Sequence, residues 1–290
     1  MERLAKPKHF DNSRLQVYAE CPKKYFNKYV LGLADPMGLV ARFSEHLFHG
    51  PITEWYFNGK GWSPSSTDWQ ERYDRMGLTK AEADVKANAV YSLANAKKLF
   101  DYYTTNFADD HDRFTILGIE EYLVDPVLGF GSKPDVRAID KATGRGYTIE
   151  LKFSGWDFIL EASIMNPQFI GQVNNTGGDA CLLTLVQPNG PWTKFHAIRD
   201  EIKPTPQDLR SWKEDKAFEM ETINRSYATD VWPKNTPHAC TNYNGCFFLE
   251  LCTAGHPEGM LERMPLAGDP LDYLGGGLSR ADRPLAEETI

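Results

Sequence analysis

Three residues close together in the sequence have side chains suited to metal-dependent phosphate chemistry. Asp135 lies in one apolar run, and Glu150 and Lys152 lie in the next run as acid–x–lysine. Carboxylate oxygens bind Mg²⁺ or Mn²⁺, and a lysine can orient or deprotonate an attacking water or balance developing charge. Because residues i and i+2 of a strand face one side, Glu150 and Lys152 should share a site while Leu151 packs behind them. The pattern is typical of phosphodiester cleavage, and a salt-bridged strand surface is the alternative.

Four of the five cysteines suggest a second site. Cys240, Cys246 and Cys252 follow a C-x5-C-x5-C spacing, whereas Cys21 lies near the N-terminus. Thiolate-rich sites select Zn²⁺ or iron–sulfur clusters, and the paired C-x2-C spacing of zinc ribbons is absent here. We therefore expect a four-cysteine cluster that joins the two ends of the chain, with three unrelated thiols as the alternative. Cys181, in the apolar run ACLLTLV, is expected to be a buried core residue.

Length and composition set broad limits on the class of protein. A chain of 290 residues with 41% hydrophobic residues can form one large domain, or a core with a small subdomain. No apolar run approaches the ~20 residues of a membrane span, and the N-terminus lacks the apolar stretch of a signal peptide. These features predict a cytoplasmic protein without a membrane partner. The net charge of −8 argues against a surface coated with basic residues.

The N-terminal segment differs from this acidic average. Residues 1–34 contain seven lysines and arginines against three acids, a net charge of +4, and aromatic residues are interleaved with them. Basic groups next to stacking groups suit single-stranded nucleic acid. The alternative is an amphipathic helix with a buried aromatic face and solvated lysines. The aromatic residues are Phe10, Tyr18, Tyr25, Phe26 and Tyr29.

Periodicity and capping residues indicate the elements that would position these side chains. Ser13 is a candidate N-cap for a first helix, Pro22 would begin a second helix ending near Gly32, and Thr205 would cap a helix to about Tyr227. Further helices are expected over about 42–57, from the Thr79/Glu82 capping box to about Phe107, and over Asn166–Asn175. Strands are expected over Phe114–Val124, Phe130–Ile139, Tyr147–Phe153, Cys181–Gln187 and Trp192–Ile198.

The order of these motifs resembles a known family. CPKKYFNKYVLGL (21–33), His49, GSKPD (131–135), IELK (149–152), Gln168 and the cysteine trio follow one another as in RecB-type PD-(D/E)XK nucleases. The likeness spans residues 13–252 and is strongest to the iron–sulfur branch, which includes AddB-type nuclease domains, CRISPR adaptation exonucleases and phage-encoded relatives. It implies an α/β fold: a restriction-endonuclease-like core with a central mixed sheet flanked by helices. It also implies a helical subdomain, clipped by the cysteine cluster, that the N- and C-terminal segments form.

The resemblance also implies roles for individual residues and the extent of the domain. Asp135, Glu150 and the Leu151 carbonyl would hold Mg²⁺ or Mn²⁺ together with a helical histidine, for which we favour His49 over His46. Lys152 would be the catalytic lysine, and Gln168 would lie on a helix beside the site. Cys21, Cys240, Cys246 and Cys252 would bind a 4Fe-4S cluster, with Zn²⁺ as the alternative. One nuclease domain would cover 1–265, with its core at about 110–200, cluster-bearing parts at about 13–33 and 236–255, and a flexible tail at 266–290.

Two departures from the family pattern stand out. Residue 172 is glutamine where the Q-x3-Y motif has tyrosine, and the first gap of the cysteine trio is five residues rather than two.

The expected function is a metal-dependent DNA nuclease, an exonuclease acting on single-stranded or end-containing DNA in recombination, repair or phage DNA metabolism. Recombination or replication proteins are possible partners. The alternative is a non-catalytic DNA-binding or recombination-partner module with a structural cluster, and a third reading is a globular protein with a structural zinc.

Overall fold

The computed structural model describes residues 3–34, 48–59, 93–153, 166–189, 193–236, 238–241, 246–254 and 261–262. The chain divides into two compact units, each of which draws on separate parts of the sequence. The first unit contains the described parts of Met1–Leu39, Val124–Ser132 and Thr205–Gly276. The second contains the described parts of Val40–Leu123 and Lys133–Pro204.

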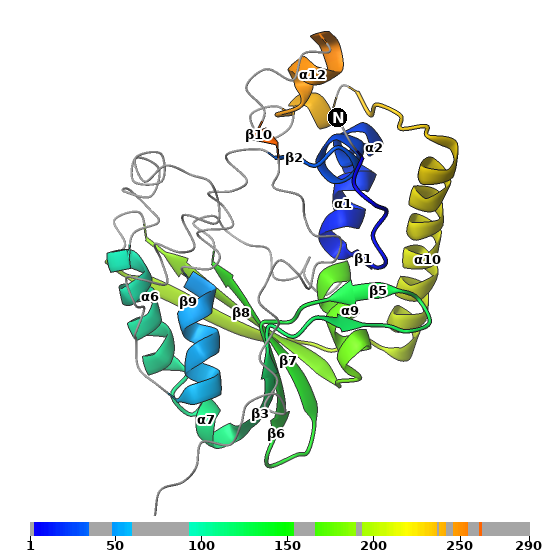
Figure 1. Cartoon of the computed structure of the whole chain (residues 1–290). Helices are drawn as coiled ribbons and strands as arrows, with labels where there is room; N and C mark the ends of the chain where they lie inside the picture. The colour runs from blue at the N-terminus through cyan, green and yellow to red at the C-terminus, as the bar shows by residue number, and fades with distance from the viewer. Residues whose placement is uncertain are drawn as a thin grey trace, which may run out of the picture. The chain divides into compact units, whose positions relative to one another are not determined.

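A five-stranded mixed sheet forms the centre of the second unit (Figure 1). Its strands are β3 (Phe114–Ile119), β6 (Val136–Asp140), β7 (Gly146–Phe153), β8 (Ala180–Pro188) and β9 (Phe195–Ile202), in that spatial order. β3, β6 and β7 form an antiparallel meander, β8 runs parallel to β7, and β9 returns antiparallel to β8. The parallel step needs a crossover, which α9 (Pro167–Thr176) provides.

Strand alternation assigns each helix to one face of this sheet. Ile149, Leu151 and Leu182 belong to a core with the helix over residues 48–58 and with α6 (Leu93–Asn106). Cys181 and Leu183 face the other way and pack against Phe169 and Val173 of α9. The short helix α7 (Asp110–Arg113) leads directly into β3. The predicted α/β class, with helices that flank a central mixed sheet, is therefore confirmed.

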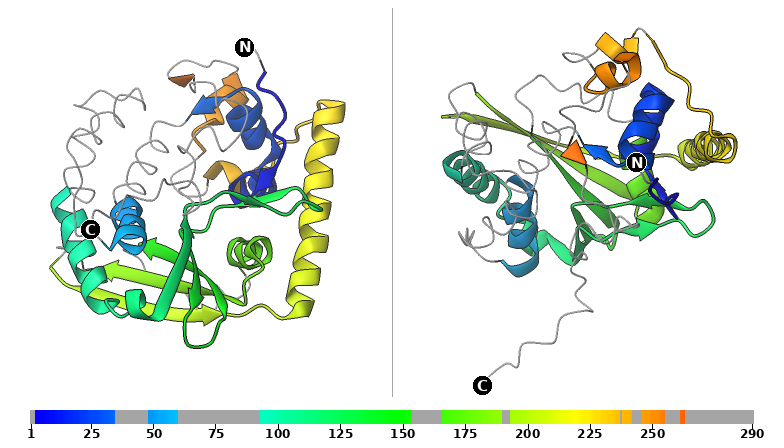
Figure 2. Two further views of the ribbon diagram at one scale, coloured as in Figure 1. Left: turned by 60° about the horizontal axis from the view of Figure 1, so that its bottom comes forward. Right: turned by 45° about the horizontal axis from the view of Figure 1, so that its top comes forward.

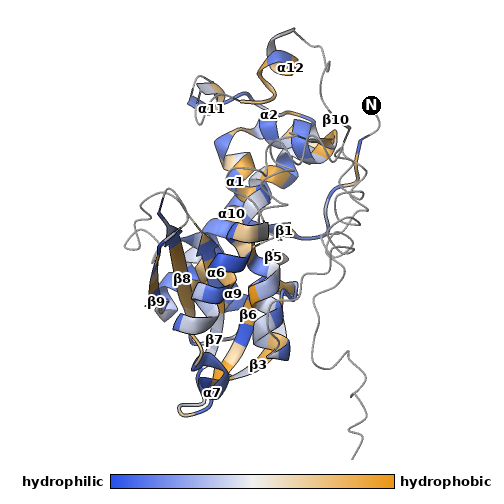
Figure 3. Cartoon of the chain, turned by 90° about the vertical axis from the view of Figure 1, so that its left-hand side faces the viewer, coloured by the Kyte–Doolittle hydropathy of each residue, from blue (hydrophilic) through white to orange (hydrophobic). Residues whose placement is uncertain are grey.

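The two helices on the first face run side by side (Figure 2). Leu99, Phe100 and Tyr103 point from α6 into the core and are at most 5% exposed. The opposite side of α6 is hydrophilic (Figure 3) and contains an exposed ion pair between Lys97 and Asp101. The predicted start of this helix at Thr79 lies outside the described residues.

Two of the predicted strands are each divided in the structure. The run Phe114–Val124 becomes β3 and a separate strand β4 (Leu123–Val124), because Glu120 adopts a left-handed φ of 47° that ends the extended backbone. The run Phe130–Ile139 becomes β5 (Phe130–Ser132) and β6, separated by residues 133–135. These two strand predictions were wrong in continuity, and the break before β6 is where Asp135 lies.

The first unit consists mainly of helices. α1 (Asn12–Glu20), α2 (Pro22–Tyr25) and the π-helix η1 (Phe26–Val30) follow one another, and the long α10 (Pro206–Thr229) belongs to the same unit. The N-cap of α1 is Asp11 rather than the predicted Ser13, since the Asp11 carboxylate accepts from the Arg14 N–H at 2.8 Å. Pro22 and Thr205 occupy their predicted places, and Thr205 forms a capping box with Asp208. Two short helices, α11 (His238–Thr241) and α12 (Leu249–Ala254), complete the helical part.

Short strands and an aromatic cluster complete the first unit. β1 (Phe10–Asp11) pairs in parallel with β5 in a sheet of order β1-β5-β4, and β2 (Leu33–Ala34) pairs with β10 (Leu261–Glu262). Tyr25 is fully buried, and its ring stacks on Trp232 with centroids 5.8 Å apart. Phe26 is also buried and packs on the same tryptophan. At these two positions the aromatic residues belong to the core rather than to a surface for stacking bases.

Some predictions fall on residues that the structure does not describe. These are the Thr79/Glu82 capping box, His46 and the tail at 266–290. In the described part of the chain, every helix is too short or too polar to cross a lipid bilayer.

Candidate active site and cysteine cavity

Asp135 and Glu150 are brought together by the pairing of β6 with β7. The last paired residues at this end are Val136 and Ile149, so the next residue of each strand segment, Asp135 and Glu150, lie beside one another. The Leu151 N–H donates to Asp135 Oδ2 at 2.7 Å and fixes that carboxylate against β7. Asp135 is 7% exposed and Glu150 is 2% exposed. The predicted juxtaposition of the two acids at the end of paired strands is thus present in the structure.

The carboxylate of Glu150 accepts hydrogen bonds from three side chains. Lys152 Nζ donates to Oε1 at 2.6 Å, and Gln168 Nε2 donates to the same oxygen at 2.7 Å. Gln172 Nε2 donates to the other oxygen, Oε2, at 2.7 Å. Lys152 and Glu150 therefore share one face of β7 as predicted, while Leu151 is fully buried on the other face.

A histidine reaches the same carboxylate pair from the helix over residues 48–58. His49 Nδ1 lies 3.4 Å from Asp135 Oδ2, and the His49 side chain is 11% exposed. The ring of Phe153 packs edge-on against the imidazole with centroids 4.9 Å apart. The structure thus places the favoured histidine, His49, at the site.

The start of α9 sets the positions of the two glutamines. Asn166 is the N-cap, its side chain accepts from the Gln168 N–H at 2.9 Å, and Pro167 begins the first turn. Residues four apart lie on one face of a helix, so Gln168 and Gln172 both point at Glu150. The capping pattern Asn166–Pro167 therefore determines which helix face meets the acid.

Burial and neighbouring charge act differently on the two acids. Burial raises the pKa of Glu150, and the negative charge of Asp135 raises it further, against the opposing effect of Lys152. Burial also disfavours the charged form of Asp135, but His49, Lys152 and the Leu151 N–H outweigh it, so the pKa of Asp135 lies below its ordinary value. Two buried carboxylates of this kind repel each other when both are ionised. A divalent cation between them would remove that repulsion.

The donor set fits a hard divalent cation, although its members would have to move closer together to coordinate one. Within the described ranges, no three histidine, cysteine, aspartate or glutamate side chains are grouped closely enough to hold a metal ion as they stand. The carbonyl oxygen Gln172 Oε1 is buried and lacks a hydrogen-bond partner among those residues. A buried unsatisfied acceptor on a side chain that is bonded to Glu150 suits a hydrated Mg²⁺ or Mn²⁺, which keeps several of its waters as donors.

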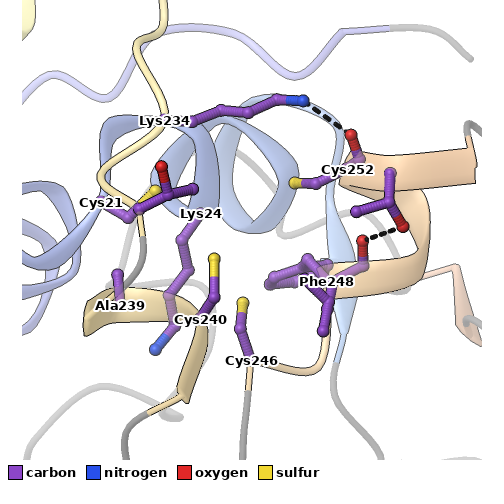
Figure 4. A pocket seen from close by; sticks show the side chains of 11 residues that line it. Cys21, Lys24, Lys234, Ala239, Cys240, Cys246, Phe248 and Cys252 are labelled. Carbon is purple, nitrogen blue, oxygen red and sulfur yellow. Dashed lines mark hydrogen bonds between the residues drawn. The ribbon is translucent and has the colours of Figure 1, made fainter.

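The four cysteines predicted to form one cluster line a single cavity in the first unit (Figure 4). This cavity has a volume of about 130 Å³. Cys21 is buried at the junction of α1 and α2, and the Asn235 N–H donates to its sulfur at 3.5 Å. A backbone hydrogen bond of 2.9 Å from Cys246 to Cys240 holds the two C-terminal thiols near each other. The distant N-terminal cysteine and the trio therefore line the same cavity, while Cys181 is fully buried in the sheet of the second unit.

The chemistry around this cavity suits a thiolate-bound metal group. Burial raises the pKa of the Cys246 thiol, while the cation of Lys24 acts in the opposite direction. Lys234 lies on the cavity wall and donates to the Cys252 carbonyl at 2.6 Å. Two lysines beside four thiols would offset the negative charge of a cluster bound through four thiolates. The sulfur atoms would have to approach one another to coordinate it, since no three ligands are grouped in the described residues.

Two features of the second unit were missed from the sequence. Gln172 was noted only as a departure from a motif, and its spacing of four residues from Gln168 was the signal that could have found its contact with Glu150. The second is a buried cluster around Arg199, which donates to both oxygens of Asp110 at 2.8 Å and to the Tyr103 hydroxyl at 2.9 Å. Tyr56, on the same helix as His49, also hydrogen-bonds to Asp110.

Comparisons with known proteins find only distant likenesses. No family model and no curated protein matches this chain. Among solved structures, SSO0001 is 14% identical with a TM-score of 0.35, covering 75% of this chain and 95% of its own. LHK-Exo in complex with dAMP is 12% identical with a TM-score of 0.32, covering 77% and 95%. A provisionally assigned exonuclease from Eubacterium rectale is 10% identical with a TM-score of 0.40, covering 86% and 94%. At such TM-scores these likenesses do not bear on the function.

Proposed function

We propose that this chain is a metal-dependent deoxyribonuclease of the RecB-type PD-(D/E)XK family that hydrolyses phosphodiester bonds. The observation that carries the proposal is the meeting of Asp135, Glu150 and Lys152 at the ends of two paired strands, with His49 3.4 Å from Asp135. The proposed substrate is single-stranded or end-containing DNA, degraded as by an exonuclease. A non-catalytic DNA-binding module would not need a lysine that is hydrogen-bonded to the buried acid.

Each residue has a task in the proposed reaction. Asp135, Glu150 and His49 would hold Mg²⁺ or Mn²⁺, with the Leu151 carbonyl as a further ligand. When bound, the metal lowers the pKa of its water and offsets charge on the transferring phosphoryl group. Lys152 orients the attacking water and balances charge near the scissile phosphate. Gln168 and Gln172 hold the Glu150 carboxylate by donating to its two oxygens.

The cysteine cavity belongs to the same proposal as a structural site. Cys21, Cys240, Cys246 and Cys252 would bind a 4Fe-4S cluster, with Zn²⁺ as the alternative. The set joins residues from α2 and from the C-terminal segment, so binding would close a long loop and add its binding free energy to folding. The proposed role is stabilisation of the first unit, and no step of the cleavage reaction is assigned to it.

The decisive experiment compares wild-type protein with Asp135→Ala and Lys152→Ala on end-labelled DNA. Wild type should degrade linear single-stranded DNA with Mn²⁺ or Mg²⁺ and not in chelator, whereas Lys152→Ala should lose ~10²–10⁴-fold in turnover. Asp135→Ala should lose both cleavage and Mn²⁺ binding. Circular single-stranded DNA should survive if the enzyme requires ends, and a matched RNA strand tests the choice of nucleic acid.

Full Mn²⁺-dependent cleavage by both variants would overturn the assignment of this site. DNA binding without cleavage by the wild type, under every divalent cation, would instead support the non-catalytic module. Circular dichroism of each variant shows that the fold is kept, which is needed because Glu150 is buried beside the lysine that is removed.

A further inference from the structure

Gln172 is the only donor to Glu150 Oε2 within the described residues. Its Nε2 lies 2.7 Å from that oxygen, while Lys152 and Gln168 both donate to Oε1. Gln172 is 1% exposed, so this hydrogen bond forms where water does not compete. The carboxylate therefore accepts hydrogen bonds at both oxygens. Loss of the bond to one oxygen would let the carboxylate rotate about its terminal torsion.

The other end of the Gln172 amide, the carbonyl oxygen Oε1, is buried and has no hydrogen-bond partner in the described part of the chain. A buried amide carbonyl without a donor is costly, at roughly 1–3 kcal/mol, unless a water or ion satisfies it. Packing alone does not account for a polar side chain in this place, since the neighbours of α9 on β8 are the apolar Cys181 and Leu183.

We infer that Gln172 is a positioning residue that holds Glu150 for the metal through its amide N–H and receives a metal-bound water on its carbonyl oxygen. The inference rests on the proposed function, because it concerns the same cation at Asp135 and Glu150. It departs from the family pattern, in which this position is a tyrosine. A tyrosine hydroxyl has a single hydrogen to donate, whereas the amide has separate donor and acceptor ends.

The inference predicts a specific kinetic and binding signature. Residues that orient a metal ligand typically contribute ~10–100-fold to metal affinity. Replacing Gln172 should therefore weaken Mn²⁺ binding by ~10–100-fold, while the maximal rate at saturating Mn²⁺ falls much less. A purely structural role would instead lower the thermal stability of the metal-free protein and leave the dissociation constant for Mn²⁺ unchanged.

The test uses the full chain, freed of loosely bound divalent cations on a chelating resin. Mn²⁺ binding is measured from the electron paramagnetic resonance signal of free Mn²⁺, for wild type, Gln172→Met and Gln172→Asn. Methionine keeps the length of the side chain but not its hydrogen bonds, and asparagine keeps the amide but shortens its reach. Asp135→Ala gives the background from any other Mn²⁺ site. Gln207→Met, at an exposed position of α10 in the other unit, is the matched control.

The expected result is weakened Mn²⁺ binding in both Gln172 variants and wild-type binding in Gln207→Met. If Gln172→Met does not fold, Gln172→Asn alone decides. Wild-type affinity in a folded Gln172 variant would overturn this inference and leave the nuclease proposal standing. Wild-type protein that binds no more Mn²⁺ than Asp135→Ala would overturn the proposed function, and this inference with it.

Discussion

At the scale of single residues, burial changes how the Glu150–Lys152 pair should be judged. An ion pair at a strand surface, the alternative interpretation of these residues, would cost only ~0–1 kcal/mol to lose. In the structure the Glu150 side chain is 3% exposed, while that of Lys152 is 31% exposed. Removing the lysine leaves a buried carboxylate with two amide donors, so Lys152→Ala should lower stability as well as turnover.

Asp140 offers a test of acid stability away from the proposed metal. Arg113 Nε donates to Oδ2 at 2.8 Å, and the N–H groups of Ala142 and Thr143 donate to Oδ1 at 3.0 Å. The Arg113 hydrogen bond, followed by the Thr143 backbone, lowers the pKa of Asp140 to about 2. The unfolded value is ~3.9, so the stabilisation is complete above that value and disappears as the pH falls towards 2.

We therefore expect Asp140→Asn to lower the melting temperature at pH 7. The difference from wild type should stay constant down to about pH 5 and shrink as the pH falls further, because wild type then also loses the charge. Melting curves at several pH values measure this. Asp101→Asn, in an exposed pair on α6, is the control and should show little difference at any pH. A gap that widens on acidification would contradict the assignment.

Residue types and order sufficed to predict most of the candidate site. Asp135, Glu150, Lys152, Gln168 and His49 were all identified, because strand alternation and the motif order constrain them. The spacing of four residues places Gln172 on the same helix face as Gln168, but its contact with Glu150 also depends on the phase of α9 against β7. That phase follows from the Asn166 cap and from packing of Phe169 and Val173 on the sheet, which involve residues far apart in the sequence.

At the scale of elements, the starts of α2 and α10 were predicted correctly, whereas Asp11 rather than Ser13 caps α1. Thr205 with Asp208 and Pro22 at the start of α2 can be predicted because helix capping depends on residues that are adjacent in the sequence. The division of Phe114–Val124 depends on a positive φ at Glu120, a residue type that seldom adopts it. Its backbone N–H donates to the Asp135 carbonyl at 3.0 Å, so a tertiary contact accompanies the break. Composition alone does not predict this hydrogen bond between Glu120 and Asp135.

The helix that carries His49 is joined to the sheet by the buried cluster around Arg199. Arg199 and Asp110 have side chains only 13% and 7% exposed, and Tyr56 of this helix bonds to both. Breaking a buried pair leaves an uncompensated charge, so Arg199→Met should reduce the free energy of unfolding by ~3–5 kcal/mol. Chemical denaturation measures the loss. Weaker Mn²⁺ binding should accompany it, because Tyr56 and His49 lie two turns apart on one helix face.

An exposed arginine on the same sheet serves as the matched control for that prediction. Arg145 pairs with Glu201 at 2.6 Å, but both side chains are about one-third exposed, so Arg145→Met should change stability by only ~0–1 kcal/mol. Adding Asp110→Asn to Arg199→Met should recover part of the loss by removing the stranded charge. Equal losses of unfolding free energy in Arg199→Met and Arg145→Met would show that burial does not determine how much each ion pair contributes to stability.

At the scale of the whole molecule, each unit contains one candidate site. The second unit holds Asp135, Glu150 and His49, and the first holds the four-cysteine cavity. Length and composition allowed a core with a small subdomain, and the family resemblance implied that this subdomain carries the cysteines. They did not anticipate that residues 124–132 join the first unit, because that assignment follows from the pairing of β5 with β1. Two-residue strands such as β1 carry almost no signal in the sequence.

This division predicts that loss of the proposed metal group at the cysteines acts mainly on the first unit. Cys246→Ala should give colourless protein with low iron content and poor solubility, because metal binding contributes directly to folding free energy. Iron analysis, absorbance near 400 nm and hydrogen exchange measure the change. Exchange should rise first in α1, α2 and α10, where Tyr18 bonds to Ser226 at 2.7 Å, and later in the central sheet.

Cys181→Ala is the control: it removes a buried thiol outside the cavity and should retain full metal content. Zinc in place of iron would select the alternative metal and keep the structural role, whereas a folded, equally stable Cys246→Ala protein would refute that role.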